Sequence, residues 1–179
     1  SPSRAAAAEP AMDGSVVIMG VAGCGKSSLG TAIAAAEGAA LVEGDEFHSE
    51  DSREKMRRGI ALTDADREGW LCTLGDKLRN RPGGVVLTCS ALKRAYRDRL
   101  REAAPGLRFV FLEIGREEAR ARVASRAPAH FFSPTLIDSQ FATLESPVGE
   151  PGVLRVDALD PLPKLQAEVS DWLRKRGGG

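Results

Sequence analysis

The string Gly20-Val-Ala-Gly-Cys-Gly-Lys-Ser27 constrains this chain more than any other feature of its sequence. It follows an apolar run over residues 15–19, which is typical of a buried strand. It precedes a helical pattern from Lys26 to about Glu37, which we expect to end at Gly38. The pattern Gly-x4-Gly-Lys-Ser between a strand and a helix is typical of loops that bind phosphate chains. The sequence therefore predicts a phosphate-binding loop at residues 20–27.

Each residue type in this loop has a physical role in holding a nucleotide. Glycines let the backbone wrap around phosphates, so that its N–H groups point inward beside a helix N-terminus. We expect Lys26 to contact the β- and γ-phosphates of ATP, and the Ser27 hydroxyl to ligate Mg²⁺. The residues predicted to bind ATP are Gly20, Val21, Ala22, Gly23, Cys24, Gly25, Lys26, Ser27 and Ser28.

The rest of the chain alternates short apolar runs with longer amphipathic stretches. The runs predict strands at residues 40–42, 85–88, 107–114 and 153–156. Apolar residues spaced three to four apart predict helices around residues 70–78, 92–100 and 162–173. Thr63, followed by Asp66, forms a variant of the capping box that begins a helix. Strands that alternate with helices favour an α/β fold, here a three-layer parallel sheet with helices on both faces.

Length and composition narrow the class of protein. A chain of 179 residues favours one domain, which we place at residues 15–176. We expect residues 1–14 to be a disordered arm or a cloning remnant, and residues 177–179 a disordered tail. The 25 basic and 25 acidic side chains cancel, which argues against nucleic acid as a partner. No apolar run approaches the roughly 20 residues of a membrane span. Three scattered cysteines favour reduced thiols in a cytoplasmic protein, with an organelle address on the complete chain left open.

A carboxylate after the second predicted strand is the candidate catalytic group. The third predicted strand ends in Thr88-Cys89-Ser90 without a carboxylate, whereas the second leads into Glu43-Gly44-Asp45. At this position Asp45 can accept the proton of an attacking hydroxyl, orient that hydroxyl, or serve as a second ligand of the metal. The alternative is a structural aspartate that caps a helix. His48, three residues later, is a candidate contact to a hydroxyl or a phosphate.

From residue 16 to about residue 147 the chain resembles the gluconokinases. The strings that carry this resemblance are Gly44-Asp45-x-x-His48, Lys55-Met56, Gly59-Ile60-Ala61-Leu62-x-Asp64-x-Asp66-Arg67-x-x-Trp70-Leu71, Cys89-Ser90-Ala91-Leu92-Lys93, Tyr96-Arg97-Asp98, His130-Phe131 and Ser139-Gln140-Phe141-x-x-Leu144-Glu145. Together these strings are far more specific than the phosphate-binding loop alone.

The resemblance implies an enzyme that converts D-gluconate and ATP to 6-phospho-D-gluconate and ADP. It also implies a P-loop kinase fold like that of shikimate and adenylate kinases, with a helical substrate region, a mobile lid over roughly residues 120–135, and a homodimer. A shikimate-type or nucleoside-monophosphate-type kinase is the alternative enzyme. The Gly-Gly-Gly run that a shikimate-type enzyme would carry after the third strand is replaced here by Cys89-Ser90-Ala91. A nucleotide-dependent switch is disfavoured, since no Asn-Lys-x-Asp string is present.

Basic residues are the candidates for holding the gluconate carboxylate and the transferred phosphate. For the substrate we select Arg53, Arg67, Lys93 and Arg97, each of which could instead be a solvated helix charge. For the phosphate we select the lid residues Arg122 and Arg126, with Arg120 nearby. The predicted catalytic residues are Lys26, Asp45, Arg122 and Arg126. We expect the strings Gln140-Phe141 and Leu144-Glu145 to serve packing rather than catalysis.

Overall fold

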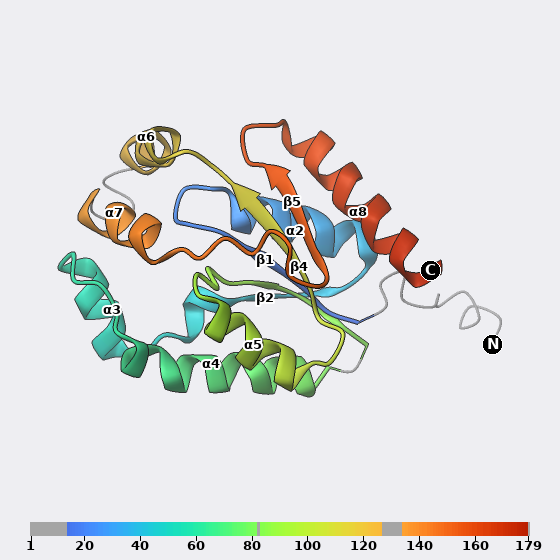
Figure 1. The fold of residues 1–179 in the computed structure, drawn as a ribbon, viewed down its shortest axis with the longest axis horizontal. Helices are drawn as coiled ribbons and strands as arrows, with labels where there is room; N and C mark the ends of the chain where they lie inside the picture. The colour runs from blue at the N-terminus through green and yellow to red at the C-terminus, as the bar shows by residue number, and fades with distance from the viewer. Residues whose placement is uncertain (1–13, 82, 127–133, 179) are drawn as a thin grey trace.

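A five-stranded parallel sheet forms the centre of the molecule in the computed structural model, which describes residues 14–81, 83–126 and 134–178. The strand order is β2-β3-β1-β4-β5 (Figure 1). The strands are β1 (Val16–Met19), β2 (Ala40–Glu43), β3 (Val85–Thr88), β4 (Arg108–Glu113) and β5 (Val153–Asp157). Each of the five predicted strands is therefore confirmed, and no strand end differs from the prediction by more than one residue.

Helices pack on both faces of this sheet. They are α2 (Lys26–Glu37), α3 (Glu50–Arg57), α4 (Asp64–Arg79), α5 (Arg94–Ala103), α6 (Arg116–Arg126), α7 (Pro134–Thr143) and α8 (Leu162–Gly178), with a 3-10 turn η1 (Gly44–Phe47). Alternate residues of β1 separate the two layers, because successive strand side chains point to opposite faces. Val16 and Ile18 join a core cluster with residues of α2, α7 and α8, whereas Val17 and Met19 join a cluster with residues of α4 and α5. The three-layer α/β fold is confirmed.

Local sequence signals account for where two of the helices begin or end. Helix α2 has the predicted bounds, and its C-cap Gly38 adopts a left-handed conformation with φ of 65°. Glycine is favoured there because it has no Cβ to clash. Helix α4 begins with a complete capping box: the Thr63 side chain accepts from the Asp66 N–H, and the Asp66 carboxylate accepts from the Thr63 N–H. The sequence did not predict η1, α3 and α7.

Some predicted regions fall on residues outside the described ranges. The arm at residues 1–14 lies outside them except for Gly14, and the tail at 177–179 is described only in part. The predicted lid spans the end of α6 and the start of α7, and residues 127–133 between them lie outside the described ranges. The arm, tail and lid therefore stay predictions. Within the described part of the chain, no helix is long and apolar enough to cross a membrane.

Candidate active site

The order of the strands creates the crevice in which a ligand can bind. The chain leaves β1 toward β2 on one side of the sheet, and after β3 it crosses to β4 on the other side of β1. In open α/β sheets, ligands bind beyond the carboxyl ends of the strands at such a reversal point. The phosphate-binding loop follows β1, η1 follows β2, and the segment at residues 89–93 follows β3. All three segments therefore meet at the same edge of the sheet.

The phosphate-binding loop has the open backbone that its sequence predicts. Gly23 and Gly25 have φ angles of 86° and 98°, which L side chains rarely adopt. Cys24 lies between them and is buried, and burial raises the pKa of its thiol, so it is an inert packing residue. The Lys26 Nζ donates to the carbonyls of Gly20 and Val21, at 3.0 and 3.2 Å. The ammonium group thus lies against the loop that is to hold the phosphates.

A carboxylate that sequence reasoning missed lies beside Ser27. The Ser27 hydroxyl donates to Glu43 Oε1 at 3.1 Å, and the Thr88 hydroxyl donates to the same oxygen. The parallel register of β2 and β3 sets Glu43 against Thr88 and brings about this contact. Glu43 stands in the string Glu43-Gly44-Asp45, at the end of the second predicted strand, and its position there is the sequence signal for this contact.

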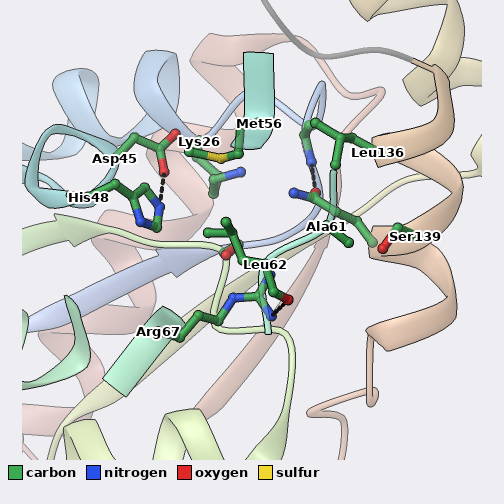
Figure 2. A pocket seen from close by; sticks show the side chains of 12 residues that line it. Lys26, Asp45, His48, Met56, Ala61, Leu62, Arg67, Leu136 and Ser139 are labelled. Carbon is green, nitrogen blue, oxygen red and sulfur yellow. Dashed lines mark hydrogen bonds and ion pairs between the residues drawn. The ribbon is translucent and has the colours of Figure 1, made fainter. Parts of the chain in front are cut away.

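A pocket opens between this edge of the sheet and helix α7. In Figure 2, Lys26, Asp45 and His48 lie on one side of the pocket and Leu136 and Ser139 of α7 lie on the other. The residues that line it are Ala22, Lys26, Asp45, His48, Met56, Ala61, Leu62, Arg67, Ser90, Leu136, Ser139 and Gln140. The structure thus brings together five of the predicted site residues, Ala22, Lys26, Asp45, His48 and Arg67.

Asp45 and His48 form a pair with contrasting exposure. The Asp45 side chain is 71% exposed, whereas that of His48 is 6% exposed, and His48 Nε2 lies 3.9 Å from Asp45 Oδ1 (Figure 2). The imidazole stacks on Trp70 with ring centroids 4.3 Å apart, and Trp70 Nε1 donates to the Gly44 carbonyl. Burial lowers the pKa of His48, Asp45 opposes that shift, and the net pKa is below 6.5. His48 is therefore neutral near pH 7, with its buried Nδ1 unpaired within the described residues.

Arg67 is the predicted substrate cation that reaches the pocket. Its Nη1 donates to the Tyr96 hydroxyl at 3.1 Å and to the Leu62 carbonyl at 3.4 Å. Its guanidinium lies 5.3 Å from the Tyr96 ring centroid. These contacts use part of its donor set and fix its orientation, so the remaining N–H groups can meet an anion in the pocket.

Arg53 and Lys93 do not line the pocket. Arg53 donates to the backbone carbonyls of Glu46 and His48, at 2.6 and 3.2 Å, and so holds the turn that carries Asp45. Lys93 Nζ donates to Asp64 Oδ1 at 3.1 Å, and this hydrogen bond raises the pKa of Lys93. Both residues support the walls of the site in this arrangement and do not face its interior.

Arg97 is fully buried, and the structure does not bring it to the pocket. Its guanidinium donates to the carbonyls of Ala91, Leu92 and Glu145, at 2.7, 3.1 and 2.9 Å, and to both carboxylate oxygens of Glu150. Burial alone would raise the pKa of Glu150, but the hydrogen bonds from Arg97 and a neighbouring arginine hold it below its usual value. The geometry does not support the predicted substrate role, because the donors of Arg97 are already used.

The two predicted lid arginines lie on α6. Arg122 Nη1 donates to the carbonyls of Gly23 and Cys24, at 3.3 and 3.2 Å, and its Nη2 donates to the Ala158 carbonyl at 2.9 Å. It therefore binds the backbone of the phosphate-binding loop and does not line the pocket. Arg126 ends α6, and its side chain lies outside the described part of the structure. A lid role for Arg126 stays a prediction.

Helix α7 contributes a residue that sequence reasoning assigned to packing. Gln140 lines the pocket, and its Oε1 accepts from the Ala22 N–H at 2.7 Å. The two residues are 118 positions apart in the chain. No local sequence pattern predicts a contact between residues so far apart, and helix α7 itself was not predicted.

Comparisons with known proteins agree with this geometry. A family model described as "AAA domain" matches residues 16–147. A gluconokinase of Gluconobacter oxydans is 42% identical over 144 residues, which span 79% of this chain and 80% of that protein. The thermosensitive gluconokinase of Escherichia coli is 39% identical over 149 residues, which span 80% of this chain and 78% of that protein.

Solved structures give the same picture. The crystal structure of a gluconokinase from Sinorhizobium meliloti matches with a TM-score of 0.85 and 45% identity, covering 92% of this chain and 93% of that one. The APS kinase CysC of Mycobacterium tuberculosis matches with a TM-score of 0.63 at 20% identity, which is evidence for a shared fold alone.

Proposed function

This chain belongs to the gluconokinase family of P-loop kinases, and we propose that it transfers the γ-phosphate of ATP to the 6-hydroxyl of D-gluconate, giving 6-phospho-D-gluconate and ADP. The observation that carries the proposal is one pocket in which Lys26 and Ala22 of the phosphate-binding loop face Asp45, His48 and Arg67. A phosphate donor and a polyol acid need these two halves next to one another.

Each half of the pocket suits one substrate. The loop amides and Lys26 bind the phosphates of ATP. At the other end, Arg67 binds the gluconate carboxylate, because a guanidinium pairs with a carboxylate through two parallel hydrogen bonds. The neutral imidazole of His48 lines this half of the pocket and contacts a gluconate hydroxyl. The apolar side chains of Met56 and Leu62 pack against the carbon chain.

Asp45 acts on the attacking hydroxyl. It orients the 6-hydroxyl of gluconate and accepts its proton as the bond from that oxygen to the γ-phosphorus forms. The bond between the γ-phosphorus and the oxygen bridging to the β-phosphate breaks, and ADP leaves. Negative charge on the transferred group is stabilised by Lys26 and the loop amides, so positioning and electrostatics supply most of the catalysis.

The site also fits Mg²⁺, which this family of reactions implies. The Ser27 hydroxyl and the Glu43 carboxylate are hard oxygen ligands, and they lie 3.1 Å apart beside the phosphate-binding loop. Within the described residues, no group of three or more His, Cys, Asp or Glu side chains could hold a metal by itself. Mg²⁺ typically takes one or two protein ligands together with phosphates and water. Ser27 and Glu43 would hold the ion, with Asp45 as a second candidate, and bound Mg²⁺ would neutralise phosphate charge.

Two finer assignments complete the proposal. A cytoplasmic location is in keeping with the free thiols of Cys24, Cys72 and Cys89. A homodimer rests on the family resemblance alone, and sedimentation of the purified chain would test it.

Turnover with a panel of acceptors tests the function. The purified chain with ATP and Mg²⁺ should produce ADP with D-gluconate, in a one-to-one ratio to 6-phospho-D-gluconate. Shikimate and nucleoside monophosphates are the acceptors of the alternative enzymes. They should give no more ADP than a control reaction without added acceptor, in which ATP is only hydrolysed by water. Faster turnover with either alternative acceptor than with D-gluconate would contradict the proposal.

A further inference from the structure

Gln140 presents two different groups to the centre of the site. Because the Ala22 N–H can only donate, the carboxamide atom that faces it at 2.7 Å is the oxygen. The Nε2 amide group must therefore point elsewhere. Within the described residues it has no hydrogen-bond partner, and Gln140 lines the same pocket as Lys26 and Asp45. A fixed donor with two hydrogens thus remains for a ligand.

The contact also fixes helix α7 against the phosphate-binding loop. Leu136 and Ile137 of α7 are buried, and Phe141 packs against the core cluster that contains Ile137. These apolar contacts hold the helix, while the hydrogen bond from Ala22 to Gln140 sets its register on the loop. The Ala22 N–H of the phosphate-binding loop therefore donates to Gln140 and not to a phosphate. Because Gln140 is bonded to this loop, its Nε2 group has a fixed position relative to the phosphates that the loop binds.

We propose that Gln140 is a catalytic residue whose Nε2 donates a hydrogen bond to the phosphoryl group during its transfer. The inference rests on the proposed kinase function. The ligands that meet in this pocket are phosphate and hydroxyl oxygens, all of which accept hydrogen bonds, and Ala22 places the carboxamide at the phosphate side. In the transition state the charge of the transferring group is spread over its three equatorial oxygens in a fixed geometry, so a preoriented donor to one of them raises kcat more than it changes KM.

Two substitutions separate this role from a merely structural one. Gln140→Glu keeps an oxygen that can accept from the Ala22 N–H but has no donor when ionised. Gln140→Met has similar length and loses both the acceptor and the donor. Ala142→Glu adds a carboxylate to an exposed position of the same helix and is the matched control for charge. For each variant we would measure kcat, the KM for gluconate, the Kd of a non-hydrolysable ATP analogue and the melting temperature.

We expect kcat to fall on the order of 10²-fold in both Gln140→Glu and Gln140→Met, as for the loss of one donor to a developing oxyanion. The KM for gluconate should stay within about threefold, and Ala142→Glu should match the wild type. Protonation of Asp45 slows both enzymes as the pH falls, so the test is the ratio of the kcat of Gln140→Glu to that of the wild type at the same pH. This ratio should rise as the pH falls, because a protonated carboxyl group is again a donor.

Other outcomes overturn the inference. If Gln140→Glu keeps normal kcat while Gln140→Met loses it, the residue only fastens α7 to the loop. If Gln140→Met keeps normal kcat, the donor is not used. A failure of the proposed function is distinguishable, because it would show as absent gluconate turnover in the wild type. The same variants could then be compared with whichever acceptor the wild type phosphorylates.

Discussion

Asp45 lines the pocket and is not the N-cap residue of a neighbouring helix. The N-cap of η1 is Glu43, and the N-cap of α3 is Ser49, whose side chain accepts from the Ser52 N–H at 3.1 Å. The alternative role of Asp45, as an aspartate that caps a helix, is therefore not supported. Its exposed carboxylate faces the pocket, where an attacking hydroxyl can reach it.

Asp45→Asn should lower kcat with gluconate by on the order of 10²-fold or more, because the amide keeps the size but cannot accept a proton as a carboxylate does. The Kd of an ATP analogue should change little, since the loop amides, Lys26 and Ser27 remain. Asp51→Asn, at an exposed position of α3, is the control and should be as active as the wild type. Near-normal kcat in Asp45→Asn would remove the residue from the mechanism.

Arg97, another predicted site residue, lies in the core and not in the pocket. It and the Glu150 carboxylate are both buried and doubly hydrogen-bonded. Arg97→Met should lower the free energy of unfolding by about 3–5 kcal/mol, because it removes one partner of a buried ion pair. Arg94→Met, at an exposed position of the same helix, should change it by less than about 0.5 kcal/mol. Urea unfolding measures both, and an unchanged midpoint with a raised gluconate KM would restore the substrate role.

At the scale of elements, α6 supports the phosphate-binding loop from outside the pocket. The three hydrogen bonds of Arg122 join this helix to the loop and to the Ala158 carbonyl after β5. Arg120, two residues earlier, forms a single ion pair within the described part of the chain, at 3.6 Å to Asp138 of α7, and both side chains are exposed. The same helix therefore offers a test residue and a matched control.

Arg122→Ala should weaken binding of an ATP analogue roughly tenfold or more, because a hydrogen bond from a charged group contributes about 1.5–3 kcal/mol. The kcat should also fall, because without Arg122 the phosphate-binding loop loses the hydrogen bonds that hold its backbone in place. The KM for gluconate should change little. Arg120→Ala should be close to the wild type in all three quantities. A change confined to the KM for gluconate would move Arg122 into the substrate pocket.

At the scale of the whole molecule, the ligands and the fold stabilise one another through the pocket. Any ligand that binds only the folded chain raises its stability, by about 2.7 kcal/mol at a concentration of 100 Kd. For a chain of this length, that corresponds to a rise in melting temperature of roughly 5–10 °C. Within the described residues, the hydrogen bonds of the Lys26 ammonium go to the loop carbonyls of Gly20 and Val21, so its removal should separate ligand binding from folding.

Lys26→Ala should abolish phosphoryl transfer and most of the rise in melting temperature caused by ATP. Without nucleotide, its melting temperature should stay within about 2 °C of the wild type, because no core contact is lost. Thermal unfolding with and without ATP, together with turnover of gluconate, checks the prediction. Near-normal turnover would contradict the assignment of the phosphate-binding loop.

The amino-acid sequence by itself determined the features that depend on neighbouring residues. The period of the apolar residues indicated five strands, the Gly38 cap ended α2 where expected, and Thr63 with Asp66 began α4. The glycines and Lys26 indicated the loop between β1 and α2. These signals lie within one turn, one loop or one strand, so they can be interpreted before the chain folds.

Only the tertiary structure decided which charged and polar side chains meet. Arg97 pairs with Glu150, 53 residues away, and Gln140 bonds to Ala22, 118 residues away. Glu43 reaches Ser27 because β2 and β3 align in parallel register. The residues next to a charged side chain in the sequence do not indicate which distant residue it will contact. Its role is set by burial and by the donors and acceptors that packing brings near it, because a buried charge must be paired whereas an exposed one remains free to bind a ligand.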